Sequence, residues 1–272
     1  MAGYGNTWSN GKSVYTQLKQ DADGHDLDPT DPDNWTVPTP IYRNDASLLN
    51  GNKQLAATAS GGVGMSLDMT YFQDADGRSY YAWQQLGATY IATMDPKDPA
   101  HVTSSPVRIV TPEYAWNAAI AEGPNVTMRD GKLYLMFSGS GVGKTYTTGL
   151  AVADAAGSDL TDPASWTALN YPIQKSGPFN GEMQLGTGHG MWSEDEDGNQ
   201  IYVFHAYATK NLGSVNATGR DMFVRRVHWA ADGMPVFDMS SSEELANKIV
   251  SVTVHVLSLI HISEPTRQEA IS

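Results

Sequence analysis

One kind of turn recurs along this chain and constrains its fold more than any other feature. An Asp-Gly pair ends at Gly77, Gly131 and Gly198, so these glycines lie 54 and 67 residues apart. Such pairs form tight turns, because Gly accepts a positive φ and Asp bonds its own backbone. Each pair leads into a short aromatic and β-branched run, which predicts a strand. These runs span residues 79–83, 133–137 and 201–204.

A second turn recurs with a similar spacing. Asp-Pro pairs place Pro32, Pro99 and Pro163 at intervals of 67 and 64 residues, and Trp35 and Trp166 follow the first and the third. A repeat of about 65 residues, made of strands and turns, suits one four-stranded blade with generous loops. We therefore predict an all-β fold and a β-propeller. A β-sandwich with similar turns is the alternative, although sandwiches rarely keep so long and regular a spacing.

Composition narrows the possible partners. The formal net charge is −13, which disfavours nucleic acids and anionic membrane surfaces, because both attract Lys and Arg. A neutral sugar suits such a surface. The chain has no cysteine, so it can form neither a disulfide nor a thiolate metal site.

The cellular location stays unknown at this stage. No apolar run approaches the roughly 20 residues that would span a bilayer. The N-terminus shows no basic stretch followed by an apolar run, which a signal peptide would need. This pattern slightly favours the cytoplasm of a bacterium, although a lost front end could have held a signal peptide.

Glu122 is the first candidate catalytic residue. It stands between the apolar residues 119–121 and the pair Gly123-Pro124. A carboxyl before Gly-Pro lies at a rigid turn, where it can point into a cavity. Apolar neighbours would raise its pKa by desolvation, which suits a general acid. A Glu that only caps a turn is the alternative.

Asp68 is the second candidate. It is an isolated acid in the otherwise apolar and aromatic segment 66–72. A buried carboxylate is costly unless it is bonded or functional. The alternative, a loop carboxylate that bonds its own backbone, is equally compatible with the sequence.

Four segments, in this order, resemble glycoside hydrolase family 43 of the arabinofuranosidase and β-xylosidase type. Asp68 precedes an aromatic residue, an Asp-Gly turn and a Tyr-x-x-Trp strand, and Glu122-Gly123-Pro124 is similar to the family's general-acid motif. The third segment, 187–206, has a Gly-His turn and carries Phe204 where the family usually has Tyr. The fourth spans 219–235, and the similarity runs over roughly residues 30–239.

The resemblance implies a five-bladed β-propeller and a role for each matched residue. Glu122 would be the general acid that protonates the leaving oxygen, and Asp68 would tune the pKa of that acid and hold it in place. Arg220 would reach the sugar hydroxyls or the acid pair. His189 would lie near the propeller axis, where some relatives bind calcium or water. The family requires no cofactor, so we expect none beyond a possible calcium ion near His189.

The resemblance also implies a residue that we do not find. Family members invert the anomeric centre, which needs a second carboxylate as base about 6.5–9.5 Å from the acid. That base is an Asp in the first blade. Asp28-Pro29 and Asp31-Pro32 precede Trp35 and look like a turn between blades instead. Trp116, shortly before Glu122, is either a stacking platform for a sugar or a core residue.

These matches divide the chain into three parts. Residues 1–239 would form an incomplete family 43 β-propeller catalytic domain whose first blade is at least partly missing. Residues 240–256 would be a linker or the start of a lost second domain. The segment 257–267 resembles an in-frame translation of a sequencing-library adapter. We interpret 257–272 as an adapter-derived artefact, and we exclude His261 and Glu264 from the site.

The favoured function is an inverting exo-glycosidase that hydrolyses terminal α-L-arabinofuranosyl residues of arabinoxylan, arabinan or oligosaccharides. Its partner would be an arabinose- or xylose-containing oligosaccharide, and neither nucleic acid nor membrane. The alternatives are a β-xylosidase of the same family and a non-catalytic carbohydrate-binding propeller, which would not need Glu122. A propeller that only scaffolds other proteins would show no cluster of acids.

The segment Ser138 to Thr145 looks like a phosphate-binding loop but fails two of its requirements. That pattern demands Gly at the first position, where Ser138 stands, and a helix afterwards. The residues that follow, 146–152, predict a strand instead. We therefore expect no nucleotide site in this segment.

Overall fold

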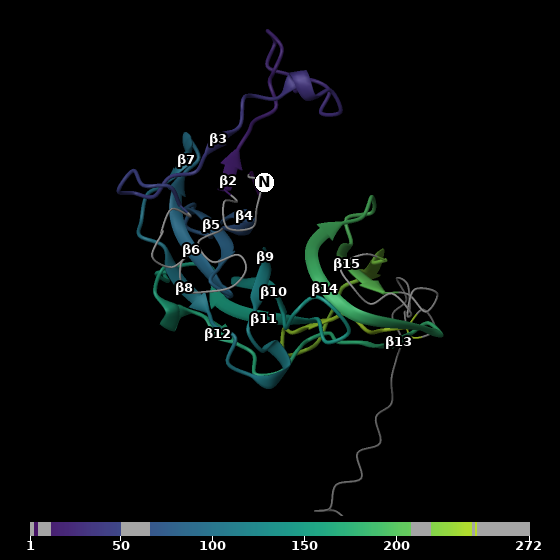
Figure 1. Ribbon diagram of the computed structural model, residues 1–272. Coiled ribbons are helices and arrows are strands. Elements are labelled where there is room, and N and C mark those ends of the chain that lie inside the picture. Colours follow the sequence, from purple (N-terminus) through teal and green to yellow (C-terminus); the bar gives the residue numbers. More distant parts are fainter. Residues whose placement is uncertain (1–2, 5–11, 50–65, 208–218, 241–242, 244–272) are drawn as a thin grey trace, which may run out of the picture. The chain divides into compact units, whose positions relative to one another are not determined.

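The computed structural model describes residues 3–4, 12–49, 66–207, 219–240 and 243. The chain divides into two compact units, Met1–Asp238 and Met239–Ser272. Only Met239, Ser240 and Glu243 of the second unit are described, so the predicted linker and the adapter-like tail lie almost wholly outside the described residues. In the first unit the described helices are single 3-10 turns and the rest of the regular structure is strand, as the all-β prediction requires (Figure 1).

Three antiparallel sheets follow one another along the chain, each built from consecutive strands. The first contains β4 (Leu67–Gln73), β5 (Ser79–Gln85), β6 (Ala88–Asp95), β7 (Asp98–Val102) and β8 (Val107–Val110). The second contains β9 (Ala121–Arg129), β10 (Lys132–Gly139), β11 (Thr147–Asp154) and β12 (Thr167–Ala168). The third contains β13 (Gly177–Phe179), β14 (Glu182–Glu194), β15 (Gln200–Tyr207) and β16 (Asp221–Arg226).

Two smaller sheets complete the described strands. One joins β1 (Gly3–Tyr4), β2 (Lys12–Tyr15) and β3 (Thr39–Pro40), and the other joins β17 (His228–Trp229) and β18 (Pro235–Val236). The repeat of about 65 residues thus corresponds to one antiparallel meander per sheet. The number of blades stays a prediction.

The Asp-Gly turns are built as the sequence predicts. In the first, Asp74 accepts hydrogen bonds at Oδ1 from the backbone N of Asp76 and Arg78, and Gly77 has a φ of 80°. The turn before β15 repeats this pattern, because Asp195 accepts from the backbone N of Asp197 and Asn199. Each turn reverses the chain between two neighbouring strands of a meander.

Two of the three Asp-Pro turns share one structure, and the third differs. The 3-10 turns η2 (Pro32–Asn34) and η4 (Pro163–Ser165) are each capped by the Asp that precedes the Pro. The following Trp indole donates to the backbone O six residues earlier in both copies. Asp98-Pro99, by contrast, opens β7, so our expectation of a third equivalent turn was wrong. β7 is an edge strand, where a Pro without an N–H is tolerated.

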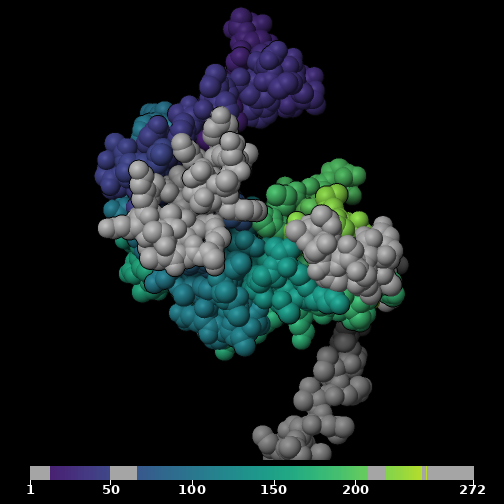
Figure 2. Space-filling model, viewed as in Figure 1, coloured from purple at the N-terminus to yellow at the C-terminus, as the bar shows by residue number. Residues whose placement is uncertain are grey.

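The second sheet packs between the first and the third, which explains the unbroken apolar sequence of β10. Leu135 and Phe137 lie in a core cluster with Tyr80 and Ile91 of the first sheet. Met136, between them, packs instead with residues of the third sheet, such as Tyr202. Side chains alternate across a strand, so a strand covered on both faces needs apolar residues at every position. Figure 2 shows the three sheets adjoining in chain order, from blue through teal to green.

Candidate active site

Three of the predicted site residues, the catalytic candidates Asp68 and Glu122 and the substrate-binding candidate His189, come from one strand of each of the three sheets. Asp68 lies on β4, Glu122 on β9 and His189 on β14. β9 packs against both of the other strands, and Figure 1 shows it between them. The structure therefore brings together three residues that are separated by more than 50 positions in the sequence.

Each of these positions coincides with an irregularity in strand pairing. Asp68 has a φ of 54° and interrupts the register between Leu67 and Thr70, while His189 has a φ of 50° in the irregular part of β14. Gly123, directly after Glu122, has a φ of 61° and lies opposite a similar shift in β10. A bulge turns side chains away from the regular alternation. Positive φ in a residue other than Gly costs energy and often marks a functional position.

The carboxyl of Glu122 is half-buried and hydrogen-bonded to a tyrosine. Tyr146 Oη donates to Glu122 Oε1 at 2.7 Å. Burial, aided by the negative charge of Asp68, raises the pKa of Glu122 above its usual value. The Tyr146 bond and the charges of His189 and Arg220 act in the opposite direction but do not cancel the effect of burial. Such a carboxyl tends to hold its proton.

Asp68 is fixed beside Glu122 through the backbone. The N–H of Gly123 donates to Asp68 Oδ2 at 3.2 Å, and Asp68 Oδ1 lies 3.6 Å from His189 Nε2. Because Gly123 follows Glu122 directly, this bond ties the Asp68 carboxylate to the bulge that aims the Glu122 side chain. An Asp that bonded only its own loop would not make this contact with β9.

His189 is an exposed residue held from both sides. Its backbone N donates to Ser138 Oγ at 2.6 Å, and its Nδ1 lies 3.3 Å from Tyr146 Oη. A Cβ on the preceding Gly188 would lie 2.5 Å from Tyr146 Cδ1. Only a glycine at this position lets the tyrosine ring lie against β14 and reach Glu122.

Arg220 joins the site through His205. Arg220 Nη1 donates to His205 Nε2 at 2.9 Å, and the His205 ring stacks on Tyr146 with centroids 5.5 Å apart. Burial, together with the positive charges of Arg220 and His189, lowers the pKa of His205 to about 4. Above that pH the ring is neutral, so its Nε2 can accept the hydrogen bond from Arg220.

A pocket of about 590 Å³ opens beside this cluster. His189, His205 and Arg220 form its polar side, and Met191, Phe204 and Met222 are among its apolar lining residues. A cavity of this size with a few convergent polar groups is typical of small-molecule sites. Glu122 is not among the described lining residues, and its link to the pocket is through His189 and Arg220, whose charges act on its carboxyl.

Trp116 lines a different pocket from His189 and Arg220. Its ring packs on Phe137 with centroids 6.1 Å apart, and its Nε1 donates to Asn170 O. It also lines a second pocket, together with residues of the segments 140–147 and 175–176. The structure thus gives Trp116 both core contacts and a place in the wall of a pocket.

Three residues of the cluster were missed by sequence reasoning. Ser138 is the first residue of the segment that we rejected as a phosphate-binding loop, Tyr146 follows that segment directly, and β11 comes next as the predicted strand. His205 lies in the segment 187–206 that resembles the family, but no role in the site was predicted for it. No local pattern marks these residues, because their partners Glu122 and His189 are 16 to 51 positions away.

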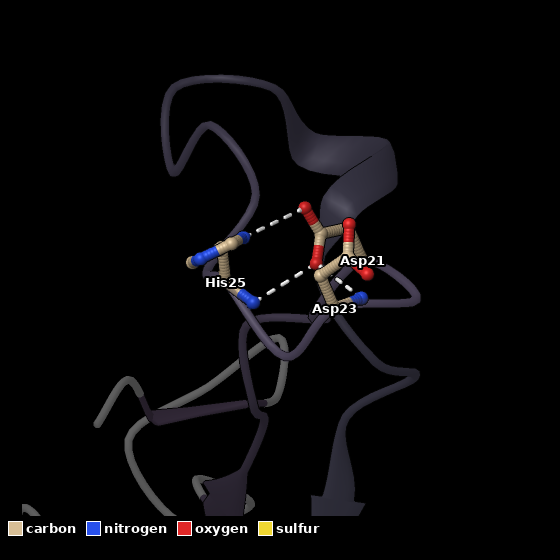
Figure 3. Close-up of side chains that lie close together, drawn as sticks. All are labelled: Asp21, Asp23 and His25. Carbon is tan, nitrogen blue, oxygen red and sulfur yellow. Dashed lines mark hydrogen bonds and ion pairs between the residues drawn. The ribbon is translucent and has the colours of Figure 1, made fainter.

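The predicted calcium ion near His189 finds no support in the described residues. Among the described residues, the group of acid and histidine side chains close enough to hold a metal ion consists of Asp21, Asp23 and His25 (Figure 3). His189 does not belong to this group. These three side chains are exposed, and Asp21 Oδ1 already accepts bonds from the backbone N of Asp23 and His25. The arrangement is that of a tight acidic turn.

Comparison with known proteins identifies a family. The model of the family described as glycosyl hydrolases family 43 matches residues 52–235. An extracellular exo-α-(1→5)-L-arabinofuranosidase of Streptomyces avermitilis is 32% identical over 185 residues, which are 63% of this chain and 37% of the relative. An enzyme of the same name from Streptomyces chartreusis is 33% identical over 159 residues, 54% of this chain and 46% of the relative.

A solved structure supports the same assignment. An α-L-arabinofuranosidase from Lactobacillus brevis is similar with a TM-score of 0.62 and 25% identity, covering 82% of this chain and 70% of that one. The chain spans less than half the length of the two Streptomyces relatives.

The comparisons correct one prediction. Both Streptomyces relatives are named as extracellular enzymes, so our slight preference for the cytoplasm was wrong. That preference depended only on the missing signal-peptide pattern at residue 1. Among the described residues, no helix has the length and apolar character needed to cross a bilayer.

Proposed function

This chain belongs to glycosyl hydrolases family 43, and we propose that it works as an inverting exo-glycosidase on terminal α-L-arabinofuranosyl residues. The substrate would be arabinoxylan, arabinan or oligosaccharides derived from them. The printed names of the two Streptomyces relatives support arabinose as the released sugar and a place of action outside the cell.

The raised pKa of Glu122 is the observation that carries this proposal. A glycosidic oxygen leaves as an alcohol only when it receives a proton as the bond to the anomeric carbon breaks. Glu122 would supply that proton. Water would attack the anomeric carbon from the opposite face and lose its own proton to a second carboxylate. We assign this second carboxylate to none of the described residues, so the proposal covers the acid half of the reaction.

The neighbours of Glu122 have complementary tasks in this scheme. Asp68, bonded to the N–H of Gly123, would keep Glu122 in place and favour its protonated form through its negative charge. Arg220 and His189 line the pocket and would bind sugar hydroxyls. Arg220 would also stabilise the Glu122 carboxylate after it has given up its proton.

The finer architecture belongs to the same proposal. We infer that residues 1–239 form an incomplete five-bladed β-propeller domain whose first blade is at least partly missing, and that the three large sheets are three of its blades. Residues 240–256 would be a linker or the beginning of another domain, and 257–272 an adapter-derived artefact. The reaction needs water and two carboxyl groups, so no cofactor takes part, and a calcium ion near His189 is not required.

Turnover of two aryl glycosides tests the function. We expect release of 4-nitrophenol from the α-L-arabinofuranoside in clear excess over the β-D-xyloside. The opposite preference would make the protein a β-xylosidase. A folded protein that binds arabino-oligosaccharides but turns over neither substrate would be the carbohydrate-binding alternative.

A further inference from the structure

We propose that the second pocket, beside Trp116, binds the carboxylate of an acidic sugar unit on the polysaccharide that carries the arabinosyl residue. The inference rests on the proposed function, because it names a part of the same substrate. The pocket has a volume of about 320 Å³, which lies in the range of about 300–1,000 Å³ typical of small-molecule sites.

Two lysines give this pocket an unusual charge. Lys144 and Lys175 both line it, in a chain whose formal net charge is −13. Both are exposed, and no carboxylate lies within 4.0 Å of either ammonium group among the described residues. An acidic surface repels anions, so a spot with two uncompensated ammonium groups is where an anionic ligand would be accommodated.

Hydrogen bonds hold the two lysines on neighbouring stretches of backbone. Ser176 Oγ donates to Lys144 O at 2.7 Å, and the same oxygen accepts from Gly186 N at 2.8 Å. Lys175 directly precedes Ser176, so one serine ties both lysine backbones together. These bonds fix the backbone positions from which the two lysine side chains extend.

The remaining wall of the pocket suits a sugar better than a bare inorganic anion. Trp116 lies at the edge, and Tyr114 stacks beside it with centroids 6.2 Å apart and planes 6° from parallel. Aromatic rings bind the apolar faces of sugar rings. Four hydroxyl side chains complete the polar part of the lining: Ser140, Thr145, Thr147 and Ser176.

Two stretches of the chain lead from this pocket to the candidate active site. Thr147 lines it, and the preceding residue, Tyr146, donates to Glu122. The 3-10 turn η3 (Ala115–Asn117), which contains Trp116, leads into β9 with Glu122. A polysaccharide whose arabinosyl branch reaches Glu122 would therefore pass a neighbouring sugar unit near Lys144 and Lys175.

Binding of a matched pair of oligosaccharides tests the proposal. One probe is an arabinoxylo-oligosaccharide with a single glucuronic acid branch, and the other is the same compound after reduction of its carboxyl to an alcohol. Calorimetry with the Glu122→Gln variant measures affinity without turnover. We expect the acidic probe to bind about two- to tenfold more tightly at low salt, the range that two exposed charge contacts provide.

Substitution of the lysines gives the decisive comparison. The Lys144→Gln/Lys175→Gln double variant should lose the preference for the acidic probe and keep its affinity for the reduced one. The charge-matched Lys19→Gln/Lys97→Gln variant, changed at two other exposed lysines, should retain the preference. The proposal would be overturned if the protein with both lysines intact bound the two probes equally tightly. It would also be overturned if both double variants lost the preference for the acidic probe to the same extent.

Hydrolysis of a neutral substrate tests the proposed function independently of the acidic-sugar site. The neutral 4-nitrophenyl α-L-arabinofuranoside has no carboxylate, so its hydrolysis should be unchanged in both lysine variants. A protein that hydrolyses this substrate but ignores the carboxylate would keep the proposed function and lose only the acidic-sugar site. A protein that prefers the acidic probe but does not hydrolyse the arabinofuranoside would keep the acidic-sugar site and lose the proposed function.

Discussion

Tyr146 Oη donates a 2.7 Å hydrogen bond to Glu122 Oε1, and this bond stabilises the charged form of the carboxyl. Burial raises the pKa of Glu122, and the tyrosine limits that rise. The Tyr146→Phe variant should therefore raise the pKa of Glu122 further. A general acid acts while it is protonated, so the alkaline limb of the pH profile should move to higher pH.

The rate of the Tyr146→Phe variant at its optimum should fall by up to about tenfold, which corresponds to one hydrogen bond of about 0.5–1.5 kcal/mol. The measurement is kcat/KM for arabinofuranoside hydrolysis between pH 4 and 9. An alkaline limb that moves to lower pH would contradict the role of this bond.

Asp68 should have the opposite effect on the same limb. Its negative charge raises the pKa of Glu122, so the Asp68→Asn variant should lower that pKa and move the alkaline limb to lower pH. Asn keeps an oxygen that can accept from the N–H of Gly123, which limits structural change. The Asp197→Asn variant, at an exposed turn, is the control and should leave the profile unchanged.

His205 should make the protein less stable in acid. Its pKa is about 4 in the folded protein, against 6.5 for the ordinary group. Between these values the unfolded chain binds more protons, so the free energy of unfolding falls as the pH drops from 6.5 towards 4. The His205→Gln variant should show a shallower decline over this window, by about one proton in the linkage slope.

Thermal unfolding at several pH values measures this difference. The exposed His25, changed to Gln, is the matched control, because its side chain is 79% exposed and its removal should not alter the slope. Parallel curves for the unchanged protein and the His205→Gln variant would exclude His205 as the cause.

Gly188 should tolerate no side chain. A Cβ there would meet the Tyr146 ring at 2.5 Å, whereas a Cβ on Gly177 would have its nearest neighbour, Lys175 O, at 4.0 Å. Gly188→Ala should cost about 1–3 kcal/mol of stability, the usual range for overpacking, and should lower activity by displacing Tyr146 from Glu122. Gly177→Ala should behave like the unchanged protein in urea unfolding and turnover, and similar losses in both variants would refute this role of Gly188.

The parts of the fold that were predictable depend on local chemistry. Asp74 and Gly77 make their turn from their own backbone bonds, and Trp166 bonds back to Leu160 within six residues. Asp98-Pro99 has the same letters as the other turns but begins a strand at a sheet edge. There Asp98 pairs with Asp95 of β6 across a tight hairpin, and the Asp-Pro pair alone does not distinguish this hairpin from the 3-10 turns.

In the candidate site, too, the residues that belong to local motifs were predictable, and those whose role depends on tertiary packing were not. Glu122 and Asp68 were recognised from motif resemblance, and the structure places Asp68 Oδ2 on the N–H that follows Glu122. Tyr146 escaped notice because its role depends on the packing of its ring against Gly188. Trp116 had two possible roles in the sequence, and in the structure it both stacks on Phe137 and lines a pocket.

The central claim is that Glu122 protonates the leaving oxygen, and leaving-group dependence tests it most directly. An α-1,5-linked arabinobiose has a poor leaving group that needs a proton, whereas 4-nitrophenolate leaves readily without one. The variant Glu122→Gln should lose about 10²- to 10⁴-fold in kcat/KM on arabinobiose and far less on 4-nitrophenyl α-L-arabinofuranoside. The exposed Glu113→Gln control should lose nothing. An equal loss on both substrates, or full activity on arabinobiose, would contradict the account.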